Sequence, residues 1–331
     1  MLSRRDEIPR HRLGERGPSV SALGYGAMGL SGVYGQADDA ESKRLIHHLV
    51  ESGITHIDTA DVYGRGHNET LLGEALSGGL REQVVLATKT GGGGVEGLGR
   101  PECIREAIDS SLKRLRTDHV DVFYLHRVDP STPIEDSVGA LAEVVEQGKA
   151  RHIGLSEVDS ETLRRAHAVH PITVTQEEYS LFARDLEADL LPTARELGVG
   201  VVAYSPLGRG VLSGAIRSAS DVENLQERQS RYPRFEADAL EQNIARVDRL
   251  GQRAEQLGTS AGALALAWLL AQGEDIVPIP GTRRVSNLDS NIEAARLELP
   301  AELVAELSEM FPPGSMAGDR YAPGVGGSVR R

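Results

Sequence analysis

The stretch that decides the fold is "VDVFYLHRVDPSTPIEDSVGALAEVVEQGKARHIGLS", residues 120–156. It opens with an apolar run at 120–125, typical of a strand buried on both faces. A helical period follows over 134–148, and a second apolar run lies at 152–156. The helical residues that share one apolar face are Val138, Leu141, Ala142, Val144 and Val145. The stretch therefore predicts a strand–helix–strand unit, whose two strands would be parallel.

The same alternation continues in both directions along the chain. The remaining strand candidates are 21–26, 54–59, 84–89, 173–176, 199–204 and 276–279. The remaining helical periods are 39–52, 68–78, 101–116, 159–169, 186–197, 260–272 and 284–295. Several periods have end signals: Ser160 and Ser260 are expected N-caps, and Gly148 and Gly198 expected C-terminal stops. Strict alternation of this length favours an α/β fold closed as a (β/α)8 TIM barrel over an open doubly wound sheet.

Three segments stand outside the alternation. Residues 8–20 contain a Gly-Pro turn and predict a hairpin before the first barrel strand. Residues 211–259 form a long insertion after the seventh strand, with an extra helix expected at 237–257, and a further helix is expected near the C-terminus. Residues 313–331 end in GVGGSVRR and are expected to form a flexible tail. We therefore predict a single barrel domain over 1–331.

Composition excludes several functional classes. The net charge of −13 argues against a nucleic-acid surface. A single cysteine, Cys103, excludes an internal disulfide and a cysteine-based metal site, and we expect no bound metal. No apolar run approaches the roughly 20 residues that span a bilayer, so no membrane partner is expected. The N-terminus lacks the apolar core of a signal peptide, so we expect a cytoplasmic protein. The sequence leaves the oligomeric state open.

A glycine triplet near the N-terminus raises the question of nucleotide binding. Gly24, Gly26 and Gly29 spell the G-x-G-x-x-G pattern of dinucleotide-binding folds. That pattern works where a helix begins directly after it, so that the helix amides face the pyrophosphate. Here the residues that follow, 31–35, are rich in helix breakers. The triplet is therefore not the fingerprint of a Rossmann fold.

Polar residues end the strand candidates, and barrel enzymes place their active sites at this end. Asp58 ends the second strand, with Tyr63 in the loop that follows, Lys89 ends the third, and His126 ends the fourth. Further polar residues at strand ends are Ser156, Glu157, Gln176, Tyr204 and Ser205.

Each of the first four has an ordinary structural explanation when taken alone, as a turn, packing or surface residue. Lysine is scarce, however, with four among the 36 basic residues, so Lys89 in an apolar strand is unlike a generic surface charge. Together the four side chains can protonate a developing alkoxide. Tyr63 keeps a proton at neutral pH, and a nearby ammonium favours its loss. The set has no hydride source and needs a reduced nicotinamide.

At this point the sequence resembles an aldo-keto reductase over about residues 8–312. The resemblance is carried by a set of motifs in order: HIDTADVYG (56–64), ATKTG (87–91), FYLHR (123–127), HIGLSE (152–157), QEEYSLF (176–182), AYSPLGRGVL (203–212) and IPGTRRVSNLDSNI (279–292). The chain looks most similar to the branch of soluble reductases related to the potassium-channel β-subunits. The resemblance implies NADPH as cofactor and small carbonyl compounds as substrates.

The resemblance also assigns roles to individual residues. It implies that Tyr63 is the general acid, assisted by Lys89 and Asp58, and that His126 orients the carbonyl. The residues implied to contact the cofactor are Gly26, Ala27, Met28, Asp58, Ser156, Gln176, Tyr204, Ser205, Pro206, Leu207, Gly208, Gly210, Ile279, Gly281, Thr282, Arg283, Asn287 and Asn291. Tyr204 would stack on the nicotinamide ring, and the segment from Gly281 would hold the 2′-phosphate and adenine. Tyr34, Tyr63, His126 and Arg127 are the candidate substrate contacts, and Tyr25, Phe182 and Tyr321 are further candidates for the pocket wall.

The sequence departs from the family pattern at three positions. Glu157 stands where many relatives have Asn, Ser290 where other branches have Glu, and Gly281 where some relatives have Lys. A preference for NADPH over NADH then depends on Arg283 or Arg284. Two other functions stay open: a regulatory subunit that binds NADPH and turns over slowly, and a hydrolase or aldolase that uses Lys89 as a Schiff base.

Overall fold

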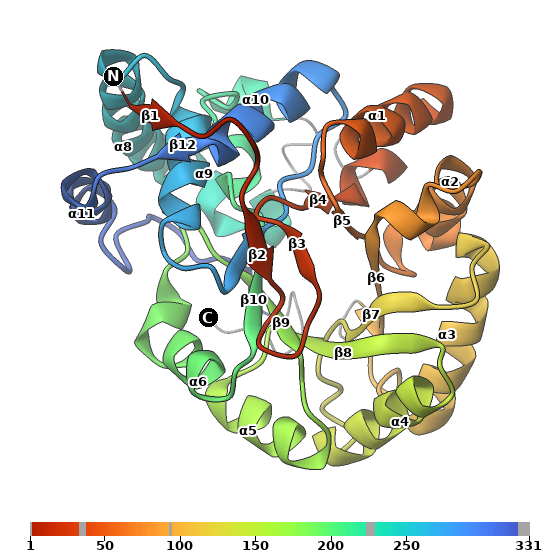
Figure 1. Ribbon diagram of the computed structural model, residues 1–331. Coiled ribbons are helices and arrows are strands. Elements are labelled where there is room, and N and C mark those ends of the chain that lie inside the picture. The colour runs from red at the N-terminus through yellow and green to blue at the C-terminus, as the bar shows by residue number, and fades with distance from the viewer. Residues whose placement is uncertain (1, 33–37, 93–94, 223–228, 324–331) are drawn as a thin grey trace.

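The computed structural model describes residues 2–32, 38–92, 95–222 and 229–323 of the chain (Figure 1). At its centre lies an 8-stranded sheet in which β4 to β11 follow one another in chain order. The strands are β4 (Tyr25–Gly26), β5 (His56–Asp58), β6 (Val85–Thr90), β7 (Val120–Leu125), β8 (Ala150–Ser156), β9 (Val174–Glu178), β10 (Gly200–Tyr204) and β11 (Ile276–Pro278). Every adjacent pair is parallel.

The sheet curls into a nearly closed barrel. The amide of Gly24 donates to the carbonyl of Pro278 (2.9 Å), which brings the start of β4 beside β11. The predicted α/β barrel is therefore confirmed. The first strand is shorter than the expected 21–26, because only Tyr25 and Gly26 pair with β5.

Helices surround the barrel (Figure 1). They are α1 (Asp39–Glu51), α2 (His67–Ala75), α3 (Pro101–Leu115), α4 (Ile134–Glu146), α5 (Ser160–Val169), α6 (Leu190–Glu196), α9 (Ala261–Leu270) and α10 (Val285–Ala295), with α8 (Ala237–Gln256) and α11 (Ala301–Met310) as the additions after the seventh strand and near the C-terminus. The helix expected at 186–197 begins only at Leu190, because Asp185–Ala188 form a 3₁₀ turn.

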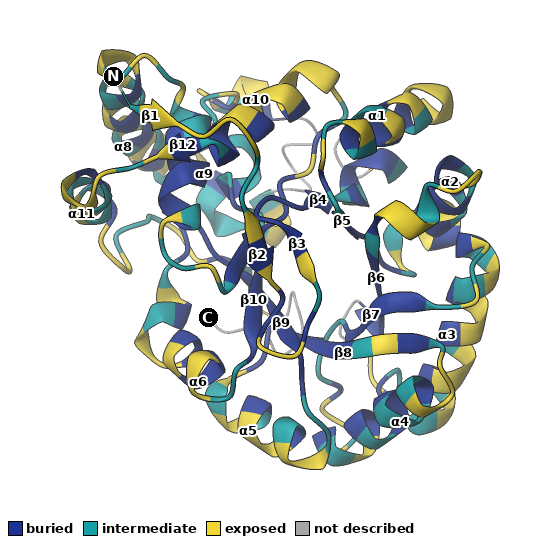
Figure 2. Cartoon of the chain, in the orientation of Figure 1, coloured by how far each residue is buried: buried dark blue, intermediate teal, exposed yellow. Residues whose placement is uncertain are grey.

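The hydrophobic core has two layers. A large cluster lies between the strands and the inward faces of the helices. A smaller one fills the barrel itself and includes Ala87, Val122, Tyr124 and Val202. Figure 2 shows the consequence: the strands are buried, whereas the helices expose only their outer faces. Burial on both sides explains why the barrel strands are apolar runs rather than alternating patterns.

The expected N-terminal hairpin is formed by β2 (Arg10–Arg12) and β3 (Ser19–Ser21), which pair antiparallel. Leu13 and Val20 from this hairpin are fully buried in the interior cluster, so the hairpin closes the amino-terminal end of the barrel. A further antiparallel pair joins β1 (Ser3–Arg4) to β12 (Leu297–Glu298). With this end closed, the opposite end is left for a site.

Helix ends follow the expected chemistry with one correction. Ser260 caps α9 by accepting from the Ala263 amide (3.2 Å). Gly148 and Gly198 follow their helices with left-handed φ values of 71° and 68°. Ser160, however, is the first residue of α5, and the cap is Asp159, whose carboxylate accepts from the Thr162 amide (2.7 Å). Serine and aspartate can both cap a helix, and the residue directly before the first helical residue is Asp159.

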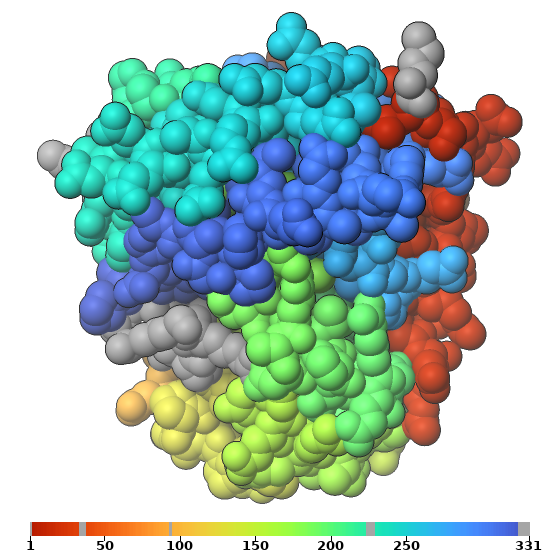
Figure 3. All heavy atoms as spheres, turned by 90° about the vertical axis from the view of Figure 1, so that its left-hand side faces the viewer, coloured from red at the N-terminus to blue at the C-terminus, as the bar shows by residue number. Residues whose placement is uncertain are grey.

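Residues 313–323 pack on the barrel instead of extending away from it as a free tail. Arg320 in this segment is 8% exposed. Figure 3 shows the face where α8 and the C-terminal segments lie together, and α11 contacts α8. The rest of the expected tail, 324–331, is outside the described residues. Within the described ranges, no helix combines the length and apolar character needed to cross a membrane, and no group of three or more His, Cys, Asp or Glu is arranged to hold a metal.

Candidate active site

The four residues expected to carry the chemistry lie at the carboxyl ends of three adjacent strands. Asp58 is the last residue of β5, Lys89 lies near the end of β6, and His126 follows β7 directly. Tyr63 lies after β5 in a short 3₁₀ segment, Tyr63–Gly66. Because parallel neighbours end at one edge of the barrel, four residues spread over 69 positions of sequence meet at its mouth.

Lys89 is the centre of this group. Its side chain is fully buried, and Nζ donates to Asp58 Oδ1 (2.5 Å), to the Thr59 carbonyl (2.8 Å) and to the Tyr63 hydroxyl (3.4 Å). Burial alone would lower the pKa of the ammonium, but the Asp58 carboxylate and the tyrosine outweigh it, so the pKa of Lys89 is raised. Lys89 is therefore a fixed positive charge beside the phenol.

Tyr63 keeps its proton in this environment. Burial raises the pKa of Tyr63, and although the Lys89 ammonium opposes this effect, the Asp58 carboxylate adds to it. The sequence had led us to expect that Lys89 would bring this pKa down. The Lys89 ammonium does lower the pKa of Tyr63, but this effect is smaller than the rise that comes from burying a phenolate. The phenol is thus a proton donor.

His126 lies with its ring edge toward the Tyr63 ring, at a centroid distance of 5.9 Å and an interplanar angle of 86°. Burial, together with the charges of Lys89 and Arg127, holds the pKa of His126 well below its usual value. The imidazole is therefore neutral at neutral pH. A neutral ring donates one N–H, which suits a hydrogen bond to a carbonyl oxygen.

The loop that carries Tyr63 is tied to the first strand. Thr59 donates its hydroxyl to the side-chain oxygen of Asn68 (2.6 Å), and Asn68 donates in turn to the carbonyl of Ala27 (2.9 Å). Gly64 and Arg65 have left-handed φ values of 57° and 55°, which produce the tight turn after Tyr63. The phenol is thereby fixed relative to the end of β4.

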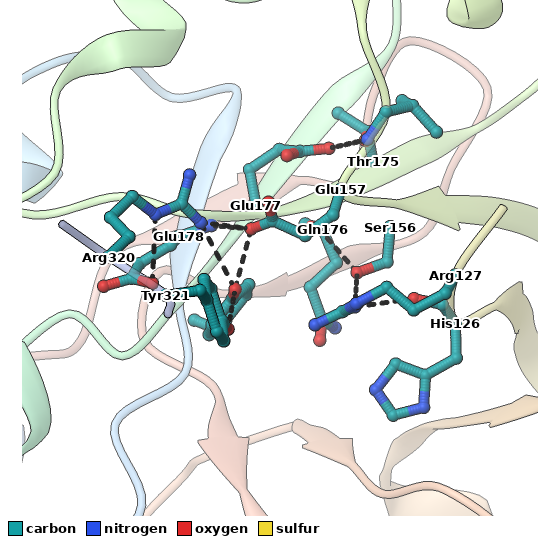
Figure 4. Close-up of polar contacts among 12 residues, drawn as sticks. His126, Arg127, Ser156, Glu157, Thr175, Gln176, Glu177, Glu178, Arg320 and Tyr321 are labelled. Carbon is teal, nitrogen blue, oxygen red and sulfur yellow. Dashed lines mark hydrogen bonds and ion pairs between the residues drawn. The ribbon is translucent and has the colours of Figure 1, made fainter. Parts of the chain in front are cut away.

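Ser156 and Gln176, expected to hold a carboxamide, pair as neighbours: Ser156 ends β8, whereas Gln176 lies inside β9, which continues to Glu178 instead of ending at 176 as expected. The Ser156 hydroxyl donates to the Gln176 carbonyl (2.9 Å) and accepts from Arg127 Nη1 (3.1 Å), as Figure 4 shows. Gln176 Nε2 donates to Asp58 Oδ2 (2.8 Å). Since the amide nitrogen faces the carboxylate, the amide oxygen is turned to accept an N–H, which fits a nicotinamide carboxamide.

The end of β4 and the segment after β11 approach each other closely. A Cβ on Gly281 would lie 2.6 Å from the carbonyl oxygen of Gly26, and one on Gly26 would lie 2.8 Å from that of Ile279. Tyr25 is fully buried and donates its hydroxyl to the Thr282 carbonyl (2.6 Å). Tyr25 therefore anchors this segment and does not line a pocket wall.

The segment then enters α10. Arg283 and Arg284 precede the helix, its first turn has no acidic residue, and both features suit an anion. Asn287 is exposed on the first turn, whereas Asn291 is 8% exposed on the second. Ser290 donates its hydroxyl to the Ser286 carbonyl of its own helix (2.8 Å).

Residues 205–210, expected to wrap a pyrophosphate, form a compact run of turns after β10. Ser205, Gly208, Arg209 and Gly210 all have left-handed φ values, between 50° and 101°. The amides of Gly208 and Gly210 donate within the loop, to Ser205 (2.9 Å) and Leu207 (3.1 Å). Successive left-handed residues make the concave backbone that is common at phosphate sites.

The structure thus brings the expected catalytic and cofactor residues to one end of the barrel. Ala27 and Met28 lie in a 3₁₀ helix directly after β4. Tyr34 is outside the described residues. Phe182 is buried and packs against Phe311. Glu178 and Arg320, which form a buried ion pair beside this group, were not predicted from the sequence. The glycine-rich composition after residue 312 indicated a free tail. Only the adjacent Arg320 and Tyr321 could have indicated that part of this segment packs on the barrel.

Known proteins share the sequence and the fold of this chain. Residues 22–311 match the aldo/keto reductase family. The chain is 44% identical over 327 residues to a protein of Glycine max named probable aldo-keto reductase 1, covering 96% of this chain and 93% of that protein. It is also similar to a crystal structure of a thermostable aldo-keto reductase, Tm1743, in complex with the inhibitor epalrestat, with a TM-score of 0.73, 32% identity and coverage of 92% of this chain and 100% of that one. The chain therefore belongs to the aldo/keto reductase family of NAD(P)-dependent oxidoreductases.

Proposed function

We propose that this protein reduces aldehydes or ketones to alcohols with NADPH. The observation that carries the proposal is the chain of contacts from Asp58 through Lys89 Nζ to the Tyr63 hydroxyl, at 2.5 Å and 3.4 Å. A phenol that keeps its proton beside a permanent ammonium is suited to protonating an oxygen as negative charge develops on it.

The roles of the side chains follow from their positions. Tyr63 holds the proton and delivers it to the carbonyl oxygen, and the Lys89 ammonium stabilises the phenolate that remains. Asp58 keeps Lys89 charged and fixed. His126, neutral, donates a hydrogen bond that orients the carbonyl. A bound reduced nicotinamide would supply the hydride.

NADPH fits the residues at this end of the barrel. Ser156 and Gln176 offer polar groups to a carboxamide, and the ring of Tyr204 offers a surface for the nicotinamide. At the far end of the site, Arg283 and Arg284 stand beside the first turn of α10, where a 2′-phosphate would meet two guanidiniums and the positive end of the helix. These two arginines support NADPH over NADH.

A Schiff-base function for Lys89 is disfavoured. A lysine nucleophile needs a lowered pKa, so that the amine is neutral. The pKa of Lys89 is raised, and its Nζ already donates to Asp58, Thr59 and Tyr63.

Arg127 is the proposed contact for a polar group on the substrate. Its Nη1 donates to the His126 carbonyl (2.6 Å) and to the Ser156 hydroxyl (3.1 Å), which places the guanidinium between the two residues (Figure 4). A carbonyl compound that carries a carboxylate or phosphate would be held here by an ionic hydrogen bond. Tyr34 stays a proposed substrate contact from the sequence alone.

The test is to titrate NADPH and NADH and then follow nicotinamide absorbance with a panel of aldehydes and ketones, some with a carboxylate. We expect turnover with a higher kcat/KM for NADPH, and Arg283→Ala with Arg284→Ala should reduce that preference. Binding without turnover would favour the regulatory role. An advantage for NADH would contradict the cofactor assignment, and absence of binding would contradict the function.

A further inference from the structure

The C-terminal segment reaches back to the mouth of the barrel through three buried charged residues and two half-buried tyrosines, which we term the C-terminal cluster: Glu157, Glu178, Arg320, Tyr204 and Tyr321. Figure 4 shows the contacts of Arg320 within it. Arg320 Nη2 donates to Glu157 Oε1 (2.6 Å), and its Nε donates to Glu178 Oε2 (3.2 Å). The side chains of these three residues are 6%, 0% and 5% exposed. One arginine thus bridges two carboxylates from the ends of neighbouring strands.

Glu157 is the acceptor on which the cluster converges. Its Oε1 also accepts from the Tyr204 hydroxyl (2.7 Å) and from the Glu178 amide (3.1 Å). The Glu157 backbone has a left-handed φ of 53°, a conformation that is unfavourable for a non-glycine residue. Such strain persists where the surrounding contacts determine a position, and it is frequent at functional sites.

Tyr204 connects the cluster to the proposed cofactor site. Because Tyr204 donates its own proton to Glu157, Tyr321 is the donor in the contact between the two hydroxyls (3.0 Å). Arg209, in the loop after β10, donates to the Tyr321 hydroxyl (3.2 Å). The phenol end of Tyr204 is therefore held on two sides, once by a strand-end carboxylate and once by the C-terminal segment.

The charges of the cluster depend on one another. Burial raises the pKa of Glu178, but Arg320, Arg209 and Arg234 outweigh it, so Glu178 is ionised. Without Arg320, two buried carboxylates would face each other with their shared cation removed, a situation that proteins tolerate poorly. Arg320 is thus needed to keep Glu157 in the position where it accepts from Tyr204.

We propose that Arg320 is a positioning residue for the cofactor: by bridging Glu157 and Glu178 it fixes the ring of Tyr204 against which the nicotinamide lies. The inference rests on the proposed function, because it requires that Tyr204 borders the nicotinamide. It also gives Glu157 a role as a positioning residue, because its Oε1 accepts from both Arg320 and Tyr204.

The test measures NADPH binding by its own fluorescence, and kcat, in Arg320→Met, Arg320→Lys and Glu157→Gln/Arg320→Met. We expect Arg320→Met to raise the Kd for NADPH about tenfold. A change of this size is typical of the coupling between residues that share one hydrogen-bond network. Arg320→Lys should recover much of this loss because it restores the charge. The double variant should bind better than Arg320→Met, because the Glu157 carboxylate that lost Arg320 is replaced by a neutral amide, while Glu178 still faces Arg209 and Arg234.

The matched control is Arg184→Met. Arg184 is a largely buried arginine whose side chain is 11% exposed and which also reaches the C-terminal part of the chain: it pairs with Glu187 (2.8 Å) and donates to the carbonyls of Ser308 and Phe311, but no hydrogen bond or ion pair joins it to the C-terminal cluster. It should lower Tm without changing the Kd for NADPH. If Arg320→Met does not fold, Tyr321→Phe decides, with an expected rise in Kd of about threefold, because the hydrogen bond that Tyr321 donates to Tyr204 is lost.

The outcomes separate the two proposals. Wild-type protein that binds NADPH, together with Arg320→Met or Tyr321→Phe variants that bind it equally well, would overturn the inference and leave the function standing. Equal losses in Arg320→Met and Arg320→Lys, matched by Arg184→Met, would also overturn it, because the effect would then be general instability. Wild-type protein that binds no NADPH would overturn both.

Discussion

Gln176 donates its side-chain amide to Asp58 across the barrel, with 2.8 Å between Nε2 and Oδ2. Lys89 occupies the other carboxylate oxygen, so both oxygens of Asp58 are held. The contact joins β9, where Gln176 would hold the cofactor, to β5, which ends at Asp58. In the proposed function, cofactor binding and proton donation would share this one set of hydrogen bonds, which is the kind of support that keeps a catalytic geometry in place.

Replacing Lys89 by Met should destabilise the protein, because Asp58 would be left as a buried charge. The side chains are 0% and 3% exposed, and breaking such a pair costs on the order of 3–5 kcal/mol. Urea unfolding should show this loss. The double variant Asp58→Asn/Lys89→Met should be more stable than Lys89→Met. A double variant that is less stable would show that packing, and not the unpaired charge, dominates.

Tyr63→Phe should bind NADPH normally and lose about 100-fold or more in kcat, because the proton is needed only in the transition state. Tyr124→Phe is the matched control. Tyr124 is also fully buried, and its ring centroid lies 6.0 Å from Lys89 Nζ, but no hydrogen bond joins its hydroxyl to Lys89 or Asp58. Its kcat should stay near that of the wild type. A Tyr63→Phe enzyme within a few-fold of the wild type would point to His126 as the acid.

Asp61→Asn should raise stability at pH 8 and leave it unchanged near pH 4. Burial, with a contribution from Glu69, raises the pKa of Asp61 to about 6, although Arg114 opposes the shift. The folded state then holds more protons than the unfolded state between about pH 4 and 6, so this carboxyl destabilises the fold as pH rises through that window. We expect a gain of about 1–2 kcal/mol from the shift in pKa. Thermal unfolding at the two pH values measures it, and an equal change at both would contradict the titration.

Gly281→Ala should lower Tm and weaken NADPH binding. The new Cβ would lie 2.6 Å from the Gly26 carbonyl oxygen, so the backbones of β4 and the segment after β11 must separate. Gly139→Ala is the control, since Gly139 lies inside α4 and a Cβ there meets nothing within 4 Å. That change should stabilise the helix by about 0.5–1 kcal/mol. A Gly281→Ala protein with normal Tm and Kd would mean that the segment can move freely.

Local sequence determined the barrel. The apolar run at 120–125 became β7 with the same bounds, because a strand covered on both faces has no polar alternation to obscure it. The positions of Asp58, Lys89 and His126 at strand ends followed from the same pattern. The helix caps were predicted less accurately. Asp159 caps α5 in place of the expected Ser160, because two neighbouring polar residues can each serve as the cap.

The sequence by itself therefore determined the eight-stranded barrel and the residues that end its strands, because alternating hydrophobicity and polar strand ends are local signals. Only the tertiary structure decided the sign of the Tyr63 pKa shift, since burial and two opposing charges act on it from separate strands. It also decided the course of residues 313–323. Arg320 lies 163 residues from Glu157 and 142 from Glu178, and no local pattern encodes a contact between groups so far apart in the chain.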